Sequence, residues 1–367
     1  MTFEQSDAAS LKTWLHFIST PNIGSIKACQ LLAAFGLPEQ ILAQSATRLT
    51  ELVGAEASRA LLRKPSESEE NFYAQTLEWA CQDNNYLLTL ADSRYPKGLL
   101  ECADPPPILY AKGRLDTLLP SAIAIVGSRN ATTQGIKNAE AFAHILANHG
   151  QVIISGMALG IDAAAHRGAL AVGVCRTIAV VGTGLDSVYP ARHRDLAHQI
   201  AEQGLLLSEL PLGSKALAHH FPRRNRIISA LSRGVLVVEA AAQSGSLITA
   251  RQAAEQGREV FAIPGSIHSP LAKGCHALIK QGAKLVESAQ DILDELGHLI
   301  TLNESSPQIE LSTENPILSL MGHDPISFDV LQGLTQYSVG ELMGLLLELE
   351  LNGQLQKLAD GRYQRLN

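Results

Sequence analysis

Residues 221–229 (FPRRNRIIS) place an aromatic ring, a proline and three arginines close together, in a chain of 367 residues whose formal net charge is −7. Three neighbouring guanidinium groups repel one another unless they are solvated or neutralised. The segment therefore predicts a binding surface for a polyanion, and phosphate is the expected group.

The direction of each side chain decides which of these arginines can reach a ligand. In a strand or turn, successive side chains point to opposite sides, so Arg224 and Arg226 are expected to share a face that Arg223 does not. The alternative, in which Asn225 or Arg226 bonds internally to loop carbonyls, stays open at this point.

Successive loops farther back in the chain combine glycine with a hydroxyl side chain. Gly127, Ser128 and Arg129 follow one aliphatic run, and Ser155 and Gly156 follow the next. Glycine lets the backbone approach a ligand, and a hydroxyl group can cap the following helix. One such loop is ordinary turn chemistry. Repetition on successive strands, with an arginine in the first loop, predicts an anion site.

A further candidate cradle for an anion begins at Ser244. Ser244, Gly245, Ser246 and Thr249 open a predicted helix, where unpaired backbone N–H groups and the positive end of the helix dipole favour a phosphate. The hydroxyl groups could serve only as caps. A glycine between two serines suits close contact with a ligand better than it suits capping.

A regular scaffold is expected to position these loops. Short aliphatic or β-branched runs alternate with helical patterns at 122–126, 151–154, 176–181, 204–208, 234–239 and 259–263. This alternation predicts an α/β fold with a doubly wound parallel sheet. Ligands bind such sheets at the carboxyl ends of the strands, which is where the candidate residues lie.

A helical domain is predicted over residues 1–75, before an α/β domain over 76–300. Apolar residues recur at helical spacing from 11 to 62, and turns at 21–24 and 53–54 interrupt them, as in SAM-like or helix-hairpin-helix modules. Lys27 is the sole basic residue near these turns, so scaffolding is expected rather than DNA binding.

A winged-helix domain is predicted over 316–367, after a polar linker at 301–315. Predicted helices at 316–321, 326–334 and 339–351 precede a two-stranded wing at 353–366. The expected recognition helix carries Glu341, Glu348 and Glu350 without a basic residue, so insertion into a DNA groove is unfavourable. We expect a protein-interaction or regulatory domain.

Formal charge differs sharply between these parts. Residues 121–290 hold 16 Lys and Arg against 10 Asp and Glu, whereas residues 1–120 hold 10 against 14 and residues 291–367 hold 3 against 12. The basic surplus belongs to the α/β domain, which is therefore the part expected to meet nucleic acid or nucleotides.

The cysteine pattern and the apolar runs indicate the cellular compartment. Five widely spaced cysteines form no C-x-x-C pair, which argues against a disulfide framework and a zinc site. The chain has neither a signal-peptide pattern nor an apolar run of about 20 residues. We expect a cytoplasmic protein without membrane contact.

Motifs of nucleotide-dependent enzymes are incomplete. Residues 182–187 (GTGLDS) break the dinucleotide pattern G-x-G-x-x-G, and no G-x-x-x-x-G-K-[ST] string occurs. Asp162, His166 and Glu239 lie near strand ends, but no pair has the spacing of an acid–base dyad, and surface or capping roles are expected for the histidines. We expect no catalytic residue, cofactor or metal.

The α/β domain resembles the DNA processing protein A family, also called DprA or Smf. The resemblance rests on GSRNATTQG (127–135), SGMALGIDAAAHRGAL (155–170), GTGLDSVYP (182–190), SELP (208–211), FPRRNRIIS (221–229), SGSLITARQAAEQGREVFAIPGS (244–266) and LIKQGA (278–283). It implies an extended Rossmann-like fold, single-stranded-DNA binding, a homodimer formed through that fold, and loading of the RecA recombinase onto incoming DNA in natural transformation. The implied function is that of a non-enzymatic recombination mediator that protects incoming DNA.

Single-stranded DNA is held by a basic groove together with aromatic rings on which bases stack. On this interpretation Arg129, Arg223, Arg224 and Arg226 neutralise phosphates, and Phe221 stacks on a base. Arg224 and Arg226 are the pair expected to matter most.

An alternative function comes from a second resemblance, to nucleoside-monophosphate-cleaving enzymes of the lysine-decarboxylase-like superfamily. Those enzymes end a strand in P-G-G-x-G-T-x-x-E, whereas residues 239–250 here read EAAAQSGSLITA. The glycine cluster and the downstream glutamate are missing. On this alternative, Glu239 would be the residue to test.

Overall fold

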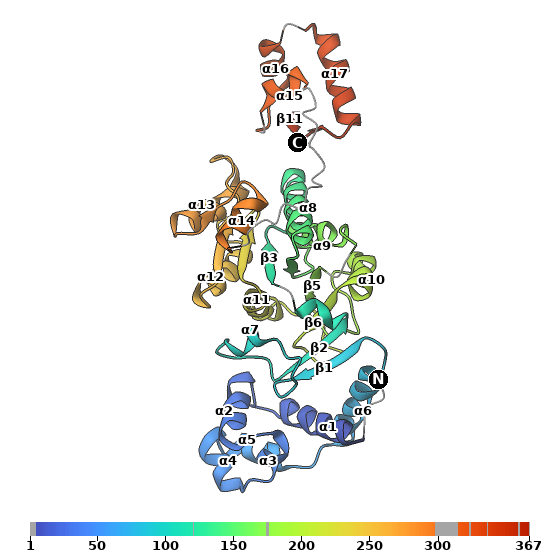
Figure 1. Cartoon of the computed structure of the whole chain (residues 1–367), viewed down its shortest axis with the longest axis vertical. Coiled ribbons are helices and arrows are strands. Elements are labelled where there is room, and N and C mark those ends of the chain that lie inside the picture. Colours follow the sequence, from blue (N-terminus) through green and yellow to red (C-terminus); the bar gives the residue numbers. More distant parts are fainter. Residues whose placement is uncertain are drawn as a thin grey trace.

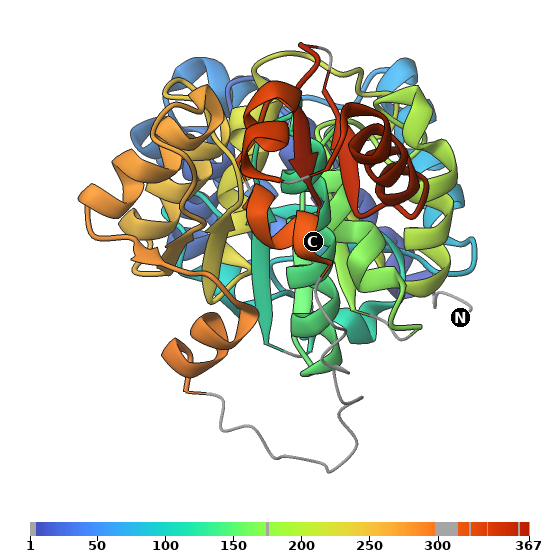
Figure 2. The ribbon, with the colours of Figure 1, turned by 90° about the horizontal axis from the view of Figure 1, so that it is seen from above.

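The structure is a computed structural model that describes residues 5–119, 121–173, 176–297, 315–322, 324–335, 337–358 and 360–366. N-terminal helices, an α/β domain and a small C-terminal domain follow one another along the long axis (Figure 1). Viewed from above, the C-terminal domain (red) lies over the green part of the α/β domain (Figure 2). Within the described ranges, no helix is long and apolar enough to cross a membrane.

The α/β domain is built on a sheet whose order, over the described residues, is β1-β2-β6-β5-β4-β3-β7-β8-β9. The strands are β1 Asn85–Thr89, β2 Ile108–Gly113, β3 Ala122–Val126, β4 Val152–Ser155, β5 Thr177–Val180, β6 Leu205–Ser208, β7 Gly234–Val237, β8 Glu259–Ala262 and β9 Lys284–Leu285. Strands β3 to β9 pair in parallel, and β1 and β2 add an antiparallel edge beside β6. The strands predicted between 122 and 263 are confirmed to within two residues at each end.

The direction of winding changes between β3 and β7. From β3 the chain moves outward through β4, β5 and β6, and then returns to place β7 on the other side of β3. Loops that leave two such neighbouring strands run in opposite directions and open a crevice at their carboxyl ends. This topological switch point is the place where the fold favours a ligand.

Helices cover both faces of the sheet. They are α7 Lys97–Leu100, α8 Thr133–Asn148, α9 Ile161–Leu170, α10 Arg194–Gln203, α11 His220–Ala230, α12 Ser246–Glu255, α13 Lys273–Lys280 and α14 Ala289–Glu295. Figure 1 shows α8, α9 and α10 to the right of the sheet and α7, α11 and α12 to its left. Side chains of β3 alternate between two cores: Ile123 and Ile125 pack with α8 and α9, whereas Ala124 and Val126 pack with α11 and α12. Burial on both faces explains the continuous aliphatic runs of these strands.

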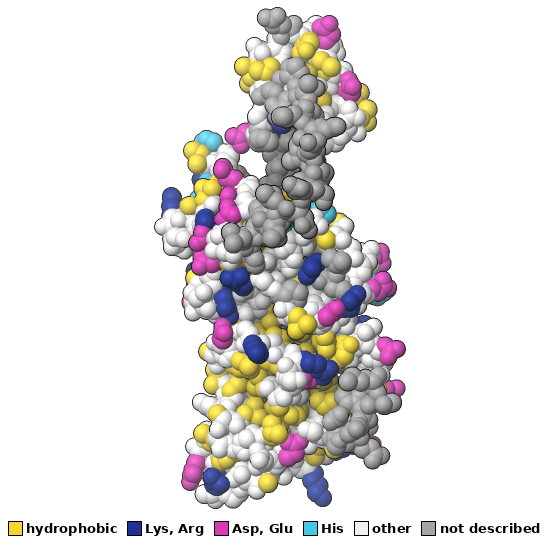
Figure 3. Space-filling view, in the orientation of Figure 1, with side chains coloured by type: hydrophobic (Ala, Val, Ile, Leu, Met, Phe, Trp, Pro, Cys, Tyr) yellow, Lys and Arg dark blue, Asp and Glu magenta, His cyan; other side chains and the backbone are white. Residues whose placement is uncertain are grey.

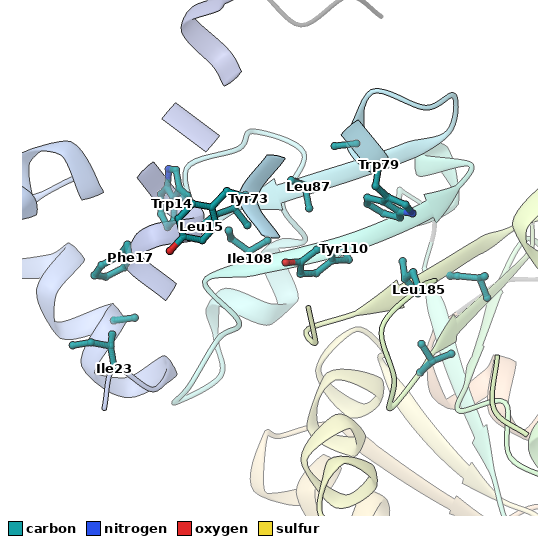
Figure 4. Packing of buried hydrophobic residues seen from close by; sticks show 14 of the residues in the cluster. Trp14, Leu15, Phe17, Ile23, Tyr73, Trp79, Leu87, Ile108, Tyr110 and Leu185 are labelled. Carbon is teal, nitrogen blue, oxygen red and sulfur yellow. The ribbon is translucent and has the colours of Figure 1, made fainter. Parts of the chain in front are cut away.

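The N-terminal helices pack against the edge of the sheet. They are α1 Gln5–Ser19, α2 Ser25–Phe35, α3 Pro38–Leu42, α4 Ala46–Val53, α5 Ala55–Leu62 and α6 Glu67–Ala80. Trp14 and Tyr73 from the helices lie in one buried cluster with Leu87, Ile108 and Tyr110 from β1 and β2 (Figure 4). This shared cluster joins the helices to the sheet. The domain boundary predicted between residues 75 and 76 falls inside α6.

The C-terminal domain has the predicted order of elements. Its helices are α15 Pro316–Met321, α16 Phe328–Leu334 and α17 Val339–Leu351, and its wing pairs β10 Leu355–Lys357 with β11 Tyr363–Arg365. The predicted linker at 301–315 lies outside the described residues except for Asn315, whose side chain accepts a hydrogen bond from the backbone N–H of Ile317 and caps α15.

Gly168 allows α9 to pack closely against α8. A Cβ atom at this position would lie 2.2 Å from the carbonyl oxygen of Glu140 on α8. We expect Gly168→Ala to lower the free energy of unfolding by about 1–3 kcal/mol, because the two helices must separate. Urea denaturation followed by circular dichroism measures the change.

Gly344→Ala in α17 is the matched control, because a Cβ atom there would meet no described residue within 4 Å beyond its own stretch of helix backbone. This substitution is expected to stabilise its helix by about 0.5–1 kcal/mol. Equal shifts of the same sign in both variants would contradict the packing argument.

Candidate functional site

The switch point holds a cavity of about 490 Å³ between the loops that leave β3 and β7. Parts of α11 and the start of α9 complete its walls. Ten of the predicted site residues line it: Gly127, Ser128, Arg129, Phe221, Arg224, Asn225, Ser244, Gly245, Ser246 and Thr249. They converge because parallel strands end at a common edge of the sheet.

The arginine segment is a helix and not a strand or turn, so the predicted side-chain alternation is wrong. Its residues lie in α11, His220–Ala230. Pro222 occupies the first turn, where a helix tolerates proline because the missing N–H would be unpaired there in any case. Arg224 and Arg226 are both buried, whereas the side chain of Arg223 is 49% exposed.

Arg224 reaches the cavity from α11, across the carboxyl end of the sheet. Its Nη1 donates a hydrogen bond to the carbonyl oxygen of Val180 at the end of β5. Burial lowers the pKa of Arg224 to about 10, the Asp162 carboxylate opposes this shift, and the Arg129 guanidinium adds to it. Arg224 is therefore still a cation at neutral pH.

Gly156 makes room for this guanidinium. A Cβ atom at Gly156 would lie 2.1 Å from Nη1 of Arg224, so the glycine acts by positioning the arginine and does not line the large cavity. Ser155 is also outside the cavity, because its buried Oγ donates to the carbonyl oxygen of Ile125 at 2.6 Å.

Asp162, at the start of α9, is the acidic partner in the cavity wall. Its Oδ2 accepts a hydrogen bond from the backbone N–H of Ala158 at 3.1 Å. Burial raises the pKa of Asp162, and the nearby Arg224 cation counteracts that rise. The charged side chains that line the cavity are Arg129, Arg224 and Asp162, which leaves it with a positive balance.

Arg226 is held in an ion-pair cluster outside the cavity. Its Nη2 lies 2.5 Å from Oε2 of Glu209, and its Nε lies 3.2 Å from Oδ2 of Asp104. Arg223 contacts the same Glu209 oxygen at 3.0 Å and donates to Oγ of Ser25 in α2 at 3.3 Å. Internal bonding, the alternative left open for Arg226, is therefore what the structure shows, with carboxylates as the acceptors in place of carbonyls.

Phe221, which lines the cavity, and Tyr189 beside it form what we call the aromatic wall. The Arg129 guanidinium carbon lies 5.6 Å from the centroid of the Phe221 ring, and the Tyr189 ring centroid lies 5.7 Å from that of Phe221. Tyr189 is 53% exposed. It borders a smaller hollow of about 90 Å³, to which Arg129, Gly156 and Phe221 also contribute.

Tyr189 was missed by the sequence interpretation. Its only signal was its place in GTGLDSVYP, the loop that follows a strand. A lone aromatic in a loop carries no direction, and its approach to Phe221 depends on the tertiary fold.

At the start of α12, the groups available to a ligand are side-chain hydroxyls and not unpaired backbone N–H groups. The Oγ atoms of Ser244 and Ser246 lie 2.7 Å apart. The N–H of Ser246 donates to Oγ of Ser244 at 3.3 Å, and the N–H groups of Leu247 and Ile248 donate to the carbonyls of Ser244 and Gly245. The prediction of unpaired N–H groups is therefore wrong at these positions, because the chain closes a hydrogen-bonded turn at the start of the helix. Apart from Gly245 and its two chain neighbours, no atom of the described residues lies within 4 Å of a Cβ atom at this position, so internal packing does not require glycine there.

The residues considered for hydrolysis have other partners. Oε2 of Glu239 accepts from the backbone N–H of Thr132 at 2.9 Å, and Oε1 accepts from its hydroxyl at 2.5 Å. His166 is buried, and its Nδ1 lies 2.7 Å from Oγ1 of Thr177. Burial lowers the pKa of the His166 imidazole to about 3. The surface or capping role expected for the histidines is wrong for His166, which is buried in the middle of α9. Among the described residues, no three His, Cys, Asp or Glu side chains are grouped so as to hold a metal ion.

One face of the molecule shows how side-chain types are distributed. In Figure 3, Lys and Arg side chains are scattered over the α/β domain, and hydrophobic side chains gather below them, where the sheet edge meets the N-terminal helices. Basic charge is thus dispersed on this face, and a continuous basic stripe is not seen there.

Two family models match the sequence. Residues 86–297 match DNA recombination-mediator protein A, and residues 303–361 match the DprA winged helix domain. Protein Smf of Escherichia coli K12 is 44% identical over 302 residues, which cover 79% of this chain and 80% of that protein. Protein Smf of Synechocystis is 36% identical over an alignment 393 residues long, which covers 96% of this chain and 98% of that protein.

Solved structures agree with these matches. The X-ray structure of DNA processing protein A from Streptococcus pneumoniae aligns with a TM-score of 0.68 and 38% identity, covering 80% of this chain and 99% of that one. A structure of DNA processing protein A from Helicobacter pylori, described for its single-stranded-DNA binding mode, aligns with a TM-score of 0.52 and 32% identity, covering 57% of this chain and 95% of that one. The chain belongs to the DNA recombination-mediator protein A family, whose members are called DprA or Smf.

Proposed function

We propose that this protein binds single-stranded DNA across the switch-point cavity and acts as a recombination mediator. The observation that carries the proposal is the aromatic wall, in which Arg129 lies over Phe221 and Tyr189 stands beside it. Proteins that bind single strands pair cationic groups for the backbone with rings for the bases. The relative from Helicobacter pylori, described for its single-stranded-DNA binding mode, supports this proposal.

The cavity suggests a division of roles among its residues. Arg129 is exposed and can meet a phosphate directly, and the buried Arg224 supplies positive potential behind it. Hydroxyl groups of Ser244 and Ser246 at the start of α12 can donate to a phosphate oxygen, where the helix dipole also favours negative charge. Phe221 and Tyr189 offer faces that accept any base.

The exposed Arg223 is a second candidate for contact with a phosphate at the margin of the site. Asn225 lines the cavity and can bond to either backbone or base. The other three predicted residues support the site without lining its cavity. Arg226 holds α11 through its ion pairs, Gly156 leaves space for the guanidinium of Arg224, and Ser155 ties β4 to β3. Recognition by such a site depends on charge and stacking, so it is insensitive to sequence.

A protein of this kind works without catalysing a reaction. By holding a strand it shifts the competition with other single-strand binders through mass action. We infer that it acts in the cytoplasm as a homodimer formed through the α/β domain, and that it loads the RecA recombinase onto incoming DNA during natural transformation. In such a dimer, once one subunit has bound a strand, the second subunit's site meets the same strand at a raised effective concentration.

Removing the exposed cation tests the contact with phosphate. Arg129→Ala is expected to weaken binding of a labelled oligothymidylate about ten-fold, because one charge-assisted contact is lost. The slope of log affinity against log salt should fall in magnitude by about 0.7. Fluorescence anisotropy across a salt series measures both quantities.

Arg167→Ala is the matched control for this experiment. Arg167 lies in α9, its side chain is 48% exposed, and it pairs with Glu140, so the same charge is removed away from the cavity. Equal losses of affinity in the two variants would mean that only net charge matters, and a flat salt dependence of the parent protein would refute phosphate binding.

Stacking on the aromatic wall predicts a different signature. Tyr189→Ala and Phe221→Ala should each weaken oligothymidylate binding by about 1–3 kcal/mol, with the salt slope unchanged because no charge is removed. Tyr189→Phe keeps the ring and should bind as the parent does. Loss of affinity in Tyr189→Phe equal to that in Tyr189→Ala would point to the hydroxyl group and contradict stacking.

The mediator role is tested with RecA itself. We expect the protein to shorten the lag of RecA assembly on single strands coated with single-strand-binding protein, as followed by DNA-dependent ATP hydrolysis. Light scattering should give the mass of a dimer, with and without oligonucleotide. A monomer in both conditions would overturn the dimer, and an unchanged lag with bound DNA would overturn RecA loading alone.

A further inference from the structure

Helix α17 of the winged-helix domain exposes a row of large apolar side chains. Val339, Met343, Leu347 and Leu351 are 49%, 55%, 57% and 80% exposed. They recur every fourth residue, so at about 100° per residue they form one continuous stripe along the helix. We call these four residues the apolar stripe.

The stripe is separate from the core of its own domain. Leu342, Leu346 and Leu349 form the buried face of α17 and pack with Ile317 and Leu331. Because the core already has its own apolar face, the stripe is a second one, which remains in contact with water. Exposed apolar patches of this kind mark interaction surfaces in soluble proteins.

Exposed apolar side chains continue beyond the N-terminal end of α17. Val330 and Leu334, one turn apart in α16, are 56% and 53% exposed, and Tyr337 in the following turn is 40% exposed. On the winged-helix domain in Figure 3, hydrophobic side chains lie next to acidic ones. The domain therefore exposes large apolar side chains on α16 as well as on α17.

Acidic side chains border the stripe. Glu341 and Glu348 lie about 60–80° beyond its edge on the helical wheel, and Glu350 lies beside Leu347 and Leu351 in the last turn. Residues 291–367 hold 12 Asp and Glu against 3 Lys and Arg. The basic side chains have partners at the wing and α15: Lys357 lies over the Tyr363 ring, Arg362 pairs with Asp360, and Arg365 donates to the carbonyl oxygen of Leu318.

This charge pattern decides the chemistry of the occupant. A nucleic-acid backbone would meet repulsion from the glutamates. A second copy of the same face would set two acidic rims against each other, which disfavours self-pairing. A partner with an apolar ridge flanked by Lys or Arg would satisfy both features, because the apolar groups would be buried and the rim charges would be complementary.

We propose that the apolar stripe docks a basic amphipathic helix of another protein. The inference is independent of the DNA-binding proposal, because it uses no residue of the switch-point cavity. It gives the winged-helix domain a role in recruitment, through a helix that in this architecture normally faces DNA.

Model peptides test the chemistry on the full-length protein. A labelled helical peptide of Leu and Lys, about four turns long, is titrated beside a Leu and Glu peptide of the same pattern and a Ser and Lys peptide of the same charge. We expect the Leu and Lys peptide to bind, the Leu and Glu peptide not to bind, and the Ser and Lys peptide to bind at least about ten-fold more weakly.

Substitutions then locate the site. The double variant Met343→Ser and Leu347→Ser should weaken binding of the Leu and Lys peptide at least about ten-fold. Ile267→Ser is the matched control, since Ile267 is 67% exposed but lies in the α/β domain. Glu348→Lys, which keeps the stripe, should weaken the Leu and Lys peptide and strengthen the Leu and Glu peptide.

Circular dichroism checks that the variants are folded, and the milder Leu347→Gln replaces the double variant if that one unfolds. Equal peptide affinity in parent and stripe variants would overturn the proposal. A concentration-dependent mass that Leu347→Gln abolishes would also overturn it, by assigning the stripe to a second copy. Oligonucleotide affinity should be unchanged in all stripe variants, so failure here is distinguishable from failure of the DNA-binding proposal.

Discussion

The burial of the Arg224 guanidinium at the carboxyl edge of the sheet is the constraint on which the site depends. A buried cation is costly unless charge and hydrogen bonds compensate it. Asp162 from α9 and the carbonyl of Val180 from β5 supply that compensation, and Gly156 after β4 leaves the necessary space. A single side chain of α11 therefore ties this helix to the carboxyl ends of β4 and β5.

Arg226, the second buried arginine of α11, has a structural role and does not line the binding cavity. Arg226 is matched by Glu209 and Asp104, and Arg223 reaches from Glu209 to Ser25 of the N-terminal helices. These contacts hold α11 against the N-terminal helices and against the segments of the α/β domain that carry Asp104 and Glu209. In the proposed binding mode, a phosphate chain meets Arg129 and the potential of Arg224, so the net positive charge of the segment is smaller than its composition indicates.

Sequence patterns predicted the sheet well, because parallel strands buried on both faces read as continuous aliphatic runs. They also predicted that Arg129, Phe221 and Ser244 would converge, since strand ends share one edge. They were wrong for the arginine segment, which is a helix in place of the expected strand or turn. They left the role of Arg226 open, because the acids that neutralise it lie at positions 104 and 209 and only the fold brings them near. Tyr189 was missed for the same reason: its partner Phe221 is distant in sequence.

Photo-crosslinking tests the central claim most directly. An oligothymidylate carrying 4-thiothymidine is irradiated with the full-length protein, and the attached peptides are identified by mass spectrometry. The proposed site predicts crosslinks at Tyr189 and Phe221, which Arg129→Ala reduces. Crosslinks confined to the N-terminal helices or to the winged-helix domain would contradict it.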